Sequence, residues 1–473
     1  MLTRRELVAC LTALAAAPRC GAQAAQAEEI PRKGPVQHIV ILGAGLAGMC
    51  AAFELRRQGH RVTILEAQMR EGGRVRTLRE GFSAGLYCEA GAETIPQSHN
   101  LPQHYAQAFG LKLVPAAIAG TRTIYHLRGQ RIVPAAGTAW PYDLTAEEKN
   151  LGLAGLRTKY LDAAVNEAVG AGFEIQPVET MLRWDSQTPG AWLRSRGASP
   201  AAAELLSLGF GADYGSAASF LLHRLNTLGT TTHFRIDGGN GCLPDEFAKR
   251  LDIRYGSPID AVSQSDSGVT VQVKRPGGAE TIQADRVICA IPCPVIGTIF
   301  DHAHLAAAKT RAIREQSYSR TIKVFLQTSS RFWLKDHLSG TAITDLPVER
   351  LSSDPGTSAD ERGALTTYTI GPYTRTLEQM SETQRVATAF DQAGRIFPEL
   401  KERFEGGIAK CWGLDPWQKG SFALHTPGQI GFIDILARRE GRIHFAGEHT
   451  SVWTGWMQGA LESARRAVRE VQV

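Results

Sequence analysis

The stretch VQHIVILGAGLAGMCAAFELRRQGHRVTILEA, residues 36–67, decides the fold. Residues 36–42 form a compact β-branched run, which predicts a buried strand. A glycine-rich turn follows, and residues 49–58, rich in alanine and leucine, predict a helix that ends near Gly59. Residues 61–65 predict a second strand. Strand, helix and strand in this order predict a βαβ unit and hence an α/β fold.

The turn carries the pattern G-x-G-x-x-G at Gly43, Gly45 and Gly48. In such a turn the first glycine permits the tight bend, the second lets a pyrophosphate approach the backbone, and the third lets helix and strand pack closely. Glu66 follows at the end of the second strand, where a carboxylate can bind both hydroxyls of a ribose. This predicts a dinucleotide site. Because the carboxylate disfavours a 2′-phosphate, NADP is disfavoured as its ligand. The residues beside the motif that we expect to contact the dinucleotide are Ala44, Ala47 and Ala67.

The rest of the chain predicts an interleaved architecture. Apolar and polar residues alternate along residues 257–273, with turn signals in the middle, which predicts a β-meander. Residues 284–292 and 441–447 predict buried strands. Residues 145–169 and 378–397 have helical patterns. We therefore predict one nucleotide-binding domain and one inserted domain. The first would comprise residues 36–100, 235–300 and 436–473, and the second residues 101–234 and 301–435.

The composition of the 473-residue chain excludes several classes of protein. Hydrophobic residues make up 43% and charged residues 21%, as in ordinary globular proteins. The net charge of +5 is spread without a long block of like charges, so we predict no nucleic-acid partner. No cysteine pair or Cys/His cluster has zinc spacing, so we predict no metal site. No apolar run reaches the ~20 residues of a transmembrane helix.

Residues 1–27 resemble an export signal. Arg4 and Arg5 precede an apolar stretch at residues 7–17, and two AQA sequences offer small-residue cleavage sites. The arginine pair resembles a twin-arginine (Tat) signal, which predicts a periplasmic or secreted protein. In an exported protein Cys289 and Cys293 could form a disulfide, although we favour two small buried side chains at the end of a strand.

A second glycine turn and the C-terminal segment together carry a resemblance to a known family. GAGLAG and LEA are followed by GGRV at residues 72–75, and HFAGEHT and GWMQGALESARRA lie between residues 444 and 467. These motifs resemble the flavin-containing amine oxidase family, which includes monoamine oxidases, polyamine oxidases and L-amino-acid oxidases. The resemblance implies a Rossmann-like FAD-binding domain with an interleaved substrate domain of mixed sheet and helices.

The resemblance also implies where FAD binds. Glu448 would contact the ribityl–phosphate part, Arg74 would reach the pyrophosphate, and residues 455–460 would run beside the isoalloxazine and begin the last helix. The N-terminal end of that helix could stabilise negative charge on the reduced flavin. The remaining candidate cofactor residues are Gly73, Gly91, Ala92, Glu93, Thr94, Ile259, Gly447, Gly455, Trp456, Met457 and Ala460.

The family reaction implies an amine substrate and molecular oxygen as partners. FAD takes a hydride equivalent from the carbon that bears a neutral amine, the resulting imine hydrolyses, and the electrons pass to O2 to give peroxide. By resemblance, Lys323 in TIKVFLQTSSRFW would hold a water near flavin N5, and Trp456 with Phe422 would form an aromatic pair facing the amine. Tyr368 resembles a tyrosine that helps to bind a substrate carboxylate. The sequence leaves open whether the chain forms a homodimer.

Two positions depart from the family pattern. Ser421 stands where monoamine oxidases attach flavin through a cysteine, so we expect non-covalent FAD. Thr94, in GAETIP, stands where L-amino-acid oxidases carry an arginine in a GAMRIP-like stretch. Because a desolvated carboxylate without a cation is costly, a primary amine or an amino-acid derivative is favoured over an L-amino acid itself. The alternatives are an L-amino-acid oxidase proper, and an FAD-dependent desaturase or isomerase or a non-catalytic flavoprotein.

Overall fold

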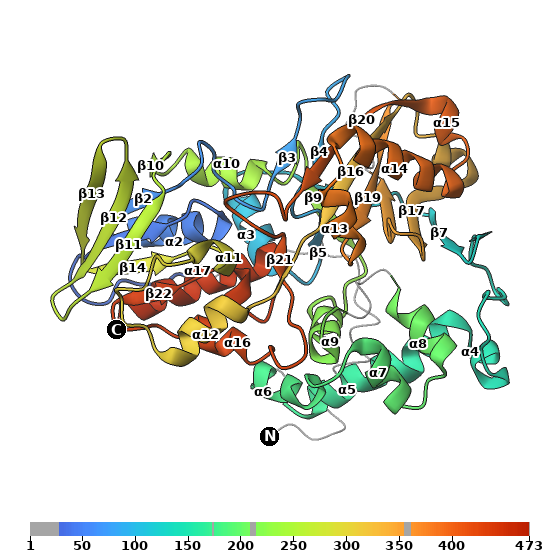
Figure 1. Ribbon diagram of the computed structural model, residues 1–473, viewed down its shortest axis with the longest axis horizontal. Coiled ribbons are helices and arrows are strands. Elements are labelled where there is room, and N and C mark those ends of the chain that lie inside the picture. The colour runs from blue at the N-terminus through green and yellow to red at the C-terminus, as the bar shows by residue number, and fades with distance from the viewer. Residues whose placement is uncertain (1–27, 173–174, 209–213, 354–360, 473) are drawn as a thin grey trace.

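The computed structural model describes residues 28–172, 175–208, 214–353 and 361–472. Figure 1 shows a parallel sheet with its helices on one side of the molecule, a larger sheet on the other side, and a group of helices below the larger sheet. The predicted export signal, residues 1–27, lies outside the described residues.

A five-stranded parallel sheet organises the first half of the molecule. Its strand order is β10-β2-β1-β14-β22, and every neighbouring pair is parallel. The chain therefore winds outward from β1 in both directions, which is the doubly wound arrangement predicted from residues 36–67. The strands are β1 (His38–Leu42), β2 (Arg61–Leu65), β10 (Ile253–Arg254), β14 (Arg286–Cys289) and β22 (Ile443–Phe445).

Different elements cover the two faces of this sheet. Ile39 and Ile41 of β1 pack with α2 (Leu46–Arg57), α3 (Asn100–Ala108), α10 (Cys242–Ala248) and α17 (Met457–Val471). Val40 and Leu42 point to the other face, where they pack with the predicted meander. This meander is an antiparallel sheet of β11 (Ile259–Gln264), β12 (Val269–Arg275) and β13 (Gly278–Ala284), and α11 (Cys293–Ile296), α12 (Ala307–Glu315) and α16 (Phe432–Ala437) lie beside it.

The predicted βαβ unit is confirmed, but its helix begins earlier than expected. The helix α2 starts at Leu46 instead of residue 49, so Gly48 lies inside its first turn. A Cβ at Gly48 would come 2.0 Å from the carbonyl oxygen of Gly43 and 3.1 Å from the Ile41 side chain. Glycine thus allows the helix to begin directly against the strand it follows.

The larger sheet has seven strands in the order β20-β16-β19-β18-β17-β7-β8. All neighbours are antiparallel except β17 and β7. The strand β16 lies between β20 and β19, is buried along its whole length, and packs against α14. The elements are β7 (Arg122–Leu127), β8 (Gln130–Ile132), β16 (Ile322–Thr328), η3 (Phe332–Asp336), β17 (Leu338–Thr344), β18 (Arg350–Ser353), β19 (Gly363–Thr369), α13 (Tyr373–Glu378), α14 (Glu382–Ile396), α15 (Leu400–Arg403) and β20 (Phe404–Cys411).

The two long helical predictions are confirmed with shifted boundaries. The first is α4 (Ala146–Arg157), η1 (Thr158–Asp162) and α5 (Ala163–Gly170). The second begins at Glu382 instead of residue 378, because Ser381 and Gln384 form a capping box that starts α14. The other helices of this region are α6 (Pro177–Met181), η2 (Leu182–Trp184), α7 (Pro189–Ser195), α8 (Pro200–Ser207) and α9 (Ala217–Asn226).

Three short sheets connect the two halves. They pair β3 (Thr77–Leu78) with β4 (Cys88–Glu89), β15 (Tyr318–Ser319) with β21 (Phe422–Ala423), and β9 (His233–Ile236) with both β5 (Ile95–Pro96) and β6 (Leu113–Pro115). The 3-10 turn η4 (Glu448–Thr450) precedes α17. The division into two interleaved domains stays a prediction. Its predicted first segment covers residues 36–100, whereas the packed core around β1 also includes α3, which begins at residue 100.

Among the described residues, no helix is both long enough and apolar enough to cross a membrane. The cysteines Cys289 and Cys293 are both buried and both free.

We predict that Gly48→Ala lowers the thermal unfolding midpoint by several degrees. The new methyl group would overlap the Gly43 carbonyl, and overpacking of this kind costs about 1–3 kcal/mol or more. The control is Gly170→Ala at the exposed end of α5, where a Cβ meets nothing within 4 Å. Circular dichroism melts measure both, and an unchanged midpoint for Gly48→Ala would show that strand and helix have room to separate.

Candidate functional site

A cavity of about 1000 Å³ lies at the carboxyl ends of the parallel strands. It is lined by residues that directly follow three of these strands, namely Gly43 after β1, Glu66 after β2 and Ala290 after β14, and by Gly447, two residues after β22. The strand order reverses between β1 and β14, and open α/β sheets bind their ligands at this position. The cavity volume is at the upper end of the range for ligand sites, about 300–1,000 Å³.

The two glycine turns face each other across one edge of the cavity. Gly45 and Gly72 form an isolated parallel bridge, and the N–H of Gly72 donates to the Ala44 carbonyl at 2.9 Å. A Cβ at Gly45 would meet nothing within 4 Å, so the backbone of the turn is open to the cavity. Gly43 has φ +97°, which only glycine adopts readily. The turn therefore leaves the space that a pyrophosphate needs.

Glu66 lies beside this turn and is almost fully buried. Its Oε2 accepts the N–H of Ala44 at 2.7 Å, and its Oε1 accepts the N–H of Gln68 at 2.8 Å. Burial raises its pKa, although these two N–H groups oppose the shift. The hydrogen bond from the Ala44 N–H therefore fixes the position of the Glu66 carboxylate.

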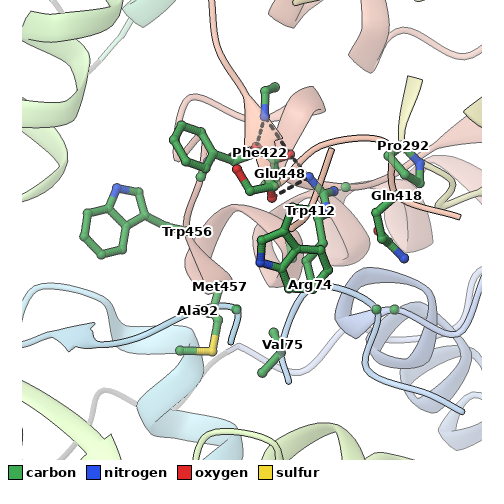
Figure 2. A pocket seen from close by; sticks show the side chains of 18 of the residues that line it. Arg74, Val75, Ala92, Pro292, Trp412, Gln418, Phe422, Glu448, Trp456 and Met457 are labelled. Carbon is green, nitrogen blue, oxygen red and sulfur yellow. Dashed lines mark hydrogen bonds and ion pairs between the residues drawn. The ribbon is translucent and has the colours of Figure 1, made fainter. Parts of the chain in front are cut away.

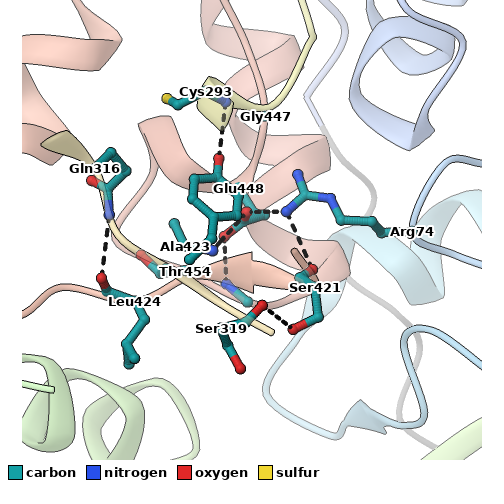
Figure 3. Close-up of polar contacts among 12 residues, drawn as sticks. Arg74, Cys293, Gln316, Ser319, Ser421, Ala423, Leu424, Gly447, Glu448 and Thr454 are labelled. Atoms are coloured by element: carbon teal, nitrogen blue, oxygen red, sulfur yellow. Dashed lines mark hydrogen bonds and ion pairs between the residues drawn. The ribbon is translucent and has the colours of Figure 1, made fainter. Parts of the chain in front are cut away.

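An ion pair between Arg74 and Glu448 joins segments 374 residues apart (Figure 2). Arg74 Nη1 lies 2.6 Å from Glu448 Oε1 and also donates to the Ser421 carbonyl at 3.3 Å. The same carboxylate accepts the N–H of Gly455 at 2.8 Å and the N–H of Ala423 at 3.2 Å (Figure 3). Three segments of the chain, at Arg74, Ala423 and Gly455, are thus fixed to one buried carboxylate on the cavity wall. Arg74 and Glu448, which were both predicted to contact the phosphate part of the cofactor, are therefore bonded to each other.

Aromatic rings form a second part of the wall. Trp456, the residue before α17, stacks on His223 of α9 with ring centres 5.3 Å apart, and His99 meets its edge at 4.9 Å. Its indole Nε1 is buried and has no partner among the described residues, which leaves a donor for a ligand. Phe422 also lines the cavity, and a Cβ at Gly455 would be 3.5 Å from its ring.

The seven-stranded sheet supplies the opposite wall through one cross-strand row. Lys323 on β16 is the direct partner of Tyr368 on β19, which is the direct partner of Arg350 on β18. Directly opposite residues share a face of a sheet. The Tyr368 ring accordingly lies between two cations, with Lys323 Nζ 5.0 Å and Arg350 Cζ 4.7 Å from its centre.

The carboxylate of Glu93, which also lines the cavity, contacts three cations. It lies 3.4 Å from Lys323, 3.1 Å from Arg350 and 3.4 Å from Arg235. Burial alone would raise the pKa of Glu93, but the positive charges of these residues hold it well below its ordinary value. Lys323 Nζ also donates to the carbonyls of Glu89 at 2.9 Å and Gly91 at 3.0 Å, and burial lowers its pKa.

The structure brings nearly all of the predicted site residues to this one cavity. Ala44 and Gly48 are the exceptions, because Ala44 lies behind the turn and Gly48 packs against β1. The predicted residues that line the cavity are Gly43, Gly45, Ala47, Glu66, Ala67, Gly73, Arg74, Gly91, Ala92, Glu93, Thr94, Ile259, Lys323, Tyr368, Phe422, Gly447, Glu448, Gly455, Trp456, Met457 and Ala460.

The sequence analysis missed many lining residues, among them Arg235, Arg350, His223 and His233. None of these four lies in a recognisable motif, and only the pairing of β18 with β19 brings Arg350 beside Tyr368. Burial and the charge of Arg350 lower the pKa of His223 to about 4, so its imidazole is neutral at neutral pH. Among the described residues no cysteine lines the cavity, and no cluster of His, Cys, Asp or Glu could hold a metal ion.

Comparison with known proteins identifies the family. The chain is 29% identical to an L-amino-acid oxidase of Siganus canaliculatus, over 93% of this chain and 86% of that protein. It is 30% identical to a flavin-dependent L-tryptophan oxidase of Lentzea aerocolonigenes, over 92% of this chain and 98% of that protein. A structure of putrescine oxidase bound to putrescine shares the fold, with a TM-score of 0.79, 22% identity, and coverage of 93% and 99% of the two chains. Residues 46–472 match the model of the flavin-containing amine oxidoreductases, and the chain belongs to this family.

Proposed function

We propose that this chain is an FAD-dependent oxidase that converts an amine to an imine and reduces O2 to hydrogen peroxide. One observation carries the proposal. The glycine turn after β1, the loop at Arg74 and the segment around Glu448 meet at a single cavity, and the row Lys323–Tyr368 lines its other wall. A desaturase or a non-catalytic flavoprotein would not need this polar, cationic wall.

The residues present fit FAD. The open backbone at Gly45, together with the neighbouring Gly73, would hold the pyrophosphate, and Glu66 would bind the ribose of the adenosine half. The start of α17 at Met457 and the unpartnered Nε1 of Trp456 would face the flavin half. Because Ser421 carries no thiol and no described cysteine lines the cavity, we propose that FAD is held without a covalent bond to sulfur.

Bound FAD would accept a hydride equivalent from the carbon bearing the amine and pass the electrons on to oxygen. The chain would then need to orient that carbon and keep the site dry. Trp456 and Phe422 present apolar rings on one side, and rings of this kind attract an amine through their quadrupoles. Lys323 places a buried ammonium group on the opposite wall, where Glu93 and two backbone carbonyls fix its position.

We also propose that the protein is exported. The support is the sequence alone, namely Arg4 and Arg5 before an apolar segment that ends in small residues. A twin-arginine route carries folded proteins, so FAD could be inserted before export.

The function is tested with the purified protein. It should be yellow, and denaturation should release all of the flavin into solution as FAD. A suitable amine or amino acid should bleach the flavin absorbance without oxygen and yield one peroxide per turnover in air. Retention of flavin by the denatured chain would refute the non-covalent site, and a yellow protein that no amine or amino acid bleaches would refute the oxidase.

Lys323→Met should leave the FAD content unchanged and lower turnover at least tenfold. The variant remains foldable because Glu93 keeps Arg350 and Arg235 as partners. Stopped-flow measurement of flavin reduction and reoxidation identifies the step that slows. Lys335→Met, at an exposed lysine beyond the same strand, is the control. Unchanged rates in Lys323→Met would remove Lys323 from the reaction.

Replacing Arg4 and Arg5 together by lysines should retain the protein in the cytoplasm, because a twin-arginine signal depends on both guanidinium groups. Fractionation of cells that express the wild-type or the variant chain measures the distribution. Equal export of the two would show that another signal, or no signal, directs this chain.

A further inference from the structure

We propose that Arg350 binds the carboxylate of the substrate, so that the amine oxidised by this chain is an α-amino acid. The inference rests on the proposed function, since it assigns one end of the substrate within the same cavity. It also reverses the preference for an amine without a carboxylate, which depended on Thr94 standing where L-amino-acid oxidases carry an arginine. An arginine from another strand supplies the missing charge.

The sheet places Arg350 where a substrate carboxylate could reach it. Arg350 is opposite Tyr368, and Tyr368 is opposite Lys323, so the three side chains share one face and line the cavity. The guanidinium carbon lies over the Tyr368 ring, 4.7 Å from its centre, in a cation–π contact that favours this position. Thr94 lies on the cavity wall one residue after Glu93, the carboxylate that bonds Arg350.

Most of the hydrogen-bonding capacity of Arg350 is unused by the protein. A guanidinium has five N–H donors, and Arg350 gives one bond to Glu93 through Nη2 at 3.1 Å. Its Nε is buried and has no partner among the described residues. About a third of the side chain remains exposed. A planar fork with unused donors is the group that binds a carboxylate through two parallel bonds.

The charges around Arg350 favour an anion. Lys323, Arg350 and Arg235 all lie within 3.4 Å of the carboxylate of Glu93. Two described carboxylates of the adjoining segments bond elsewhere: Glu89 accepts the Thr77 hydroxyl and the Asn240 N–H, and Glu349 accepts the N–H groups of Ile370 and Gly371. His223 and His233 also face Arg350, and its charge helps to lower the pKa of each.

Glu93 acts here as a positioning residue. It accepts a hydrogen bond from Nη2 of Arg350, which leaves the other N–H donors of this cavity-lining guanidinium for a ligand. It also offsets part of the cost of burying three cations close together, because unpaired buried charge is strongly unfavourable. Arg350 and Glu93 thus form one unit in which the carboxylate orients and the arginine binds.

The substrate test uses matched pairs that differ only in the carboxylate, such as L-tryptophan with tryptamine and L-phenylalanine with phenethylamine. In any pair that the wild-type holoenzyme oxidises, kcat/KM should be at least tenfold higher for the amino acid than for the matched amine. Equal or better turnover of the plain amines would overturn the inference while leaving the amine oxidase intact.

Arg350→Met should raise KM for the amino acid at least tenfold and lower the ratio of kcat/KM for the amino acid to kcat/KM for the matched plain amine at least tenfold. Arg350→Lys should recover part of the loss, because it restores the charge without the fork. Arg375→Met, at an exposed arginine just beyond β19, controls for the loss of one positive charge. Equal losses for amino acid and amine in Arg350→Met would assign Arg350 a purely structural role and overturn the inference.

A binding experiment separates this inference from the proposed function. Calorimetry with 3-phenylpropionate, a carboxylate that has no amine to oxidise, should show binding to the wild-type holoprotein and at least tenfold weaker binding to Arg350→Met. This result is expected even if no amine reduces the bound flavin, in which case only the proposed function fails. Absence of binding to the wild type, or equal affinity in the variant, would overturn the carboxylate site.

Discussion

The site depends on one buried ion pair, Arg74 with Glu448. The two residues belong to opposite ends of the chain, and each would be costly to bury alone, since removing one partner of such a pair typically costs about 3–5 kcal/mol. Glu448 also accepts the N–H groups of Gly455 and Ala423, so its second oxygen is satisfied by backbone. The carboxylate therefore fixes the loop after β2, the strand that holds Phe422 and the approach to α17 in one arrangement (Figure 3). The cavity exists because these segments are held around it.

Two different sheets line the cavity. The parallel sheet presents the ends of its strands, where short turns expose backbone N–H groups and a carboxylate suited to a dinucleotide. The seven-stranded sheet presents a face instead, and its cross-strand row aligns three long polar side chains. The first arrangement suits a ligand bound through its phosphates and ribose. The second suits a smaller ligand held by charge and shape. A cofactor side and a substrate side follow from this difference.

The sequence predicts the cofactor side far better than the substrate side. Gly43, Gly45 and Glu66 lie within one local unit, where spacing alone fixes the geometry. Glu448 and Trp456 lie far along the chain, and the resemblance to a family was needed to relate them to the glycine turn. Arg350 could not be predicted, because its place depends on which strand pairs with β19, and the sequence does not encode that pairing locally. His223 stacks on Trp456 from a helix that no motif connects to the site.

The cluster around Glu93 is hard to explain as a device for stability. Buried ion pairs stabilise a fold little, because the cost of removing the charges from water offsets their attraction. Three cations around one carboxylate cost more, since their like charges repel one another. A hydrophobic row on the same face of β16, β18 and β19 would pack without that cost. Natural chains keep such local conflicts mainly where function requires them. The unfavourable placement of Lys323 and Arg350 therefore supports a wall that is completed, in charge as well as in shape, by an anionic ligand.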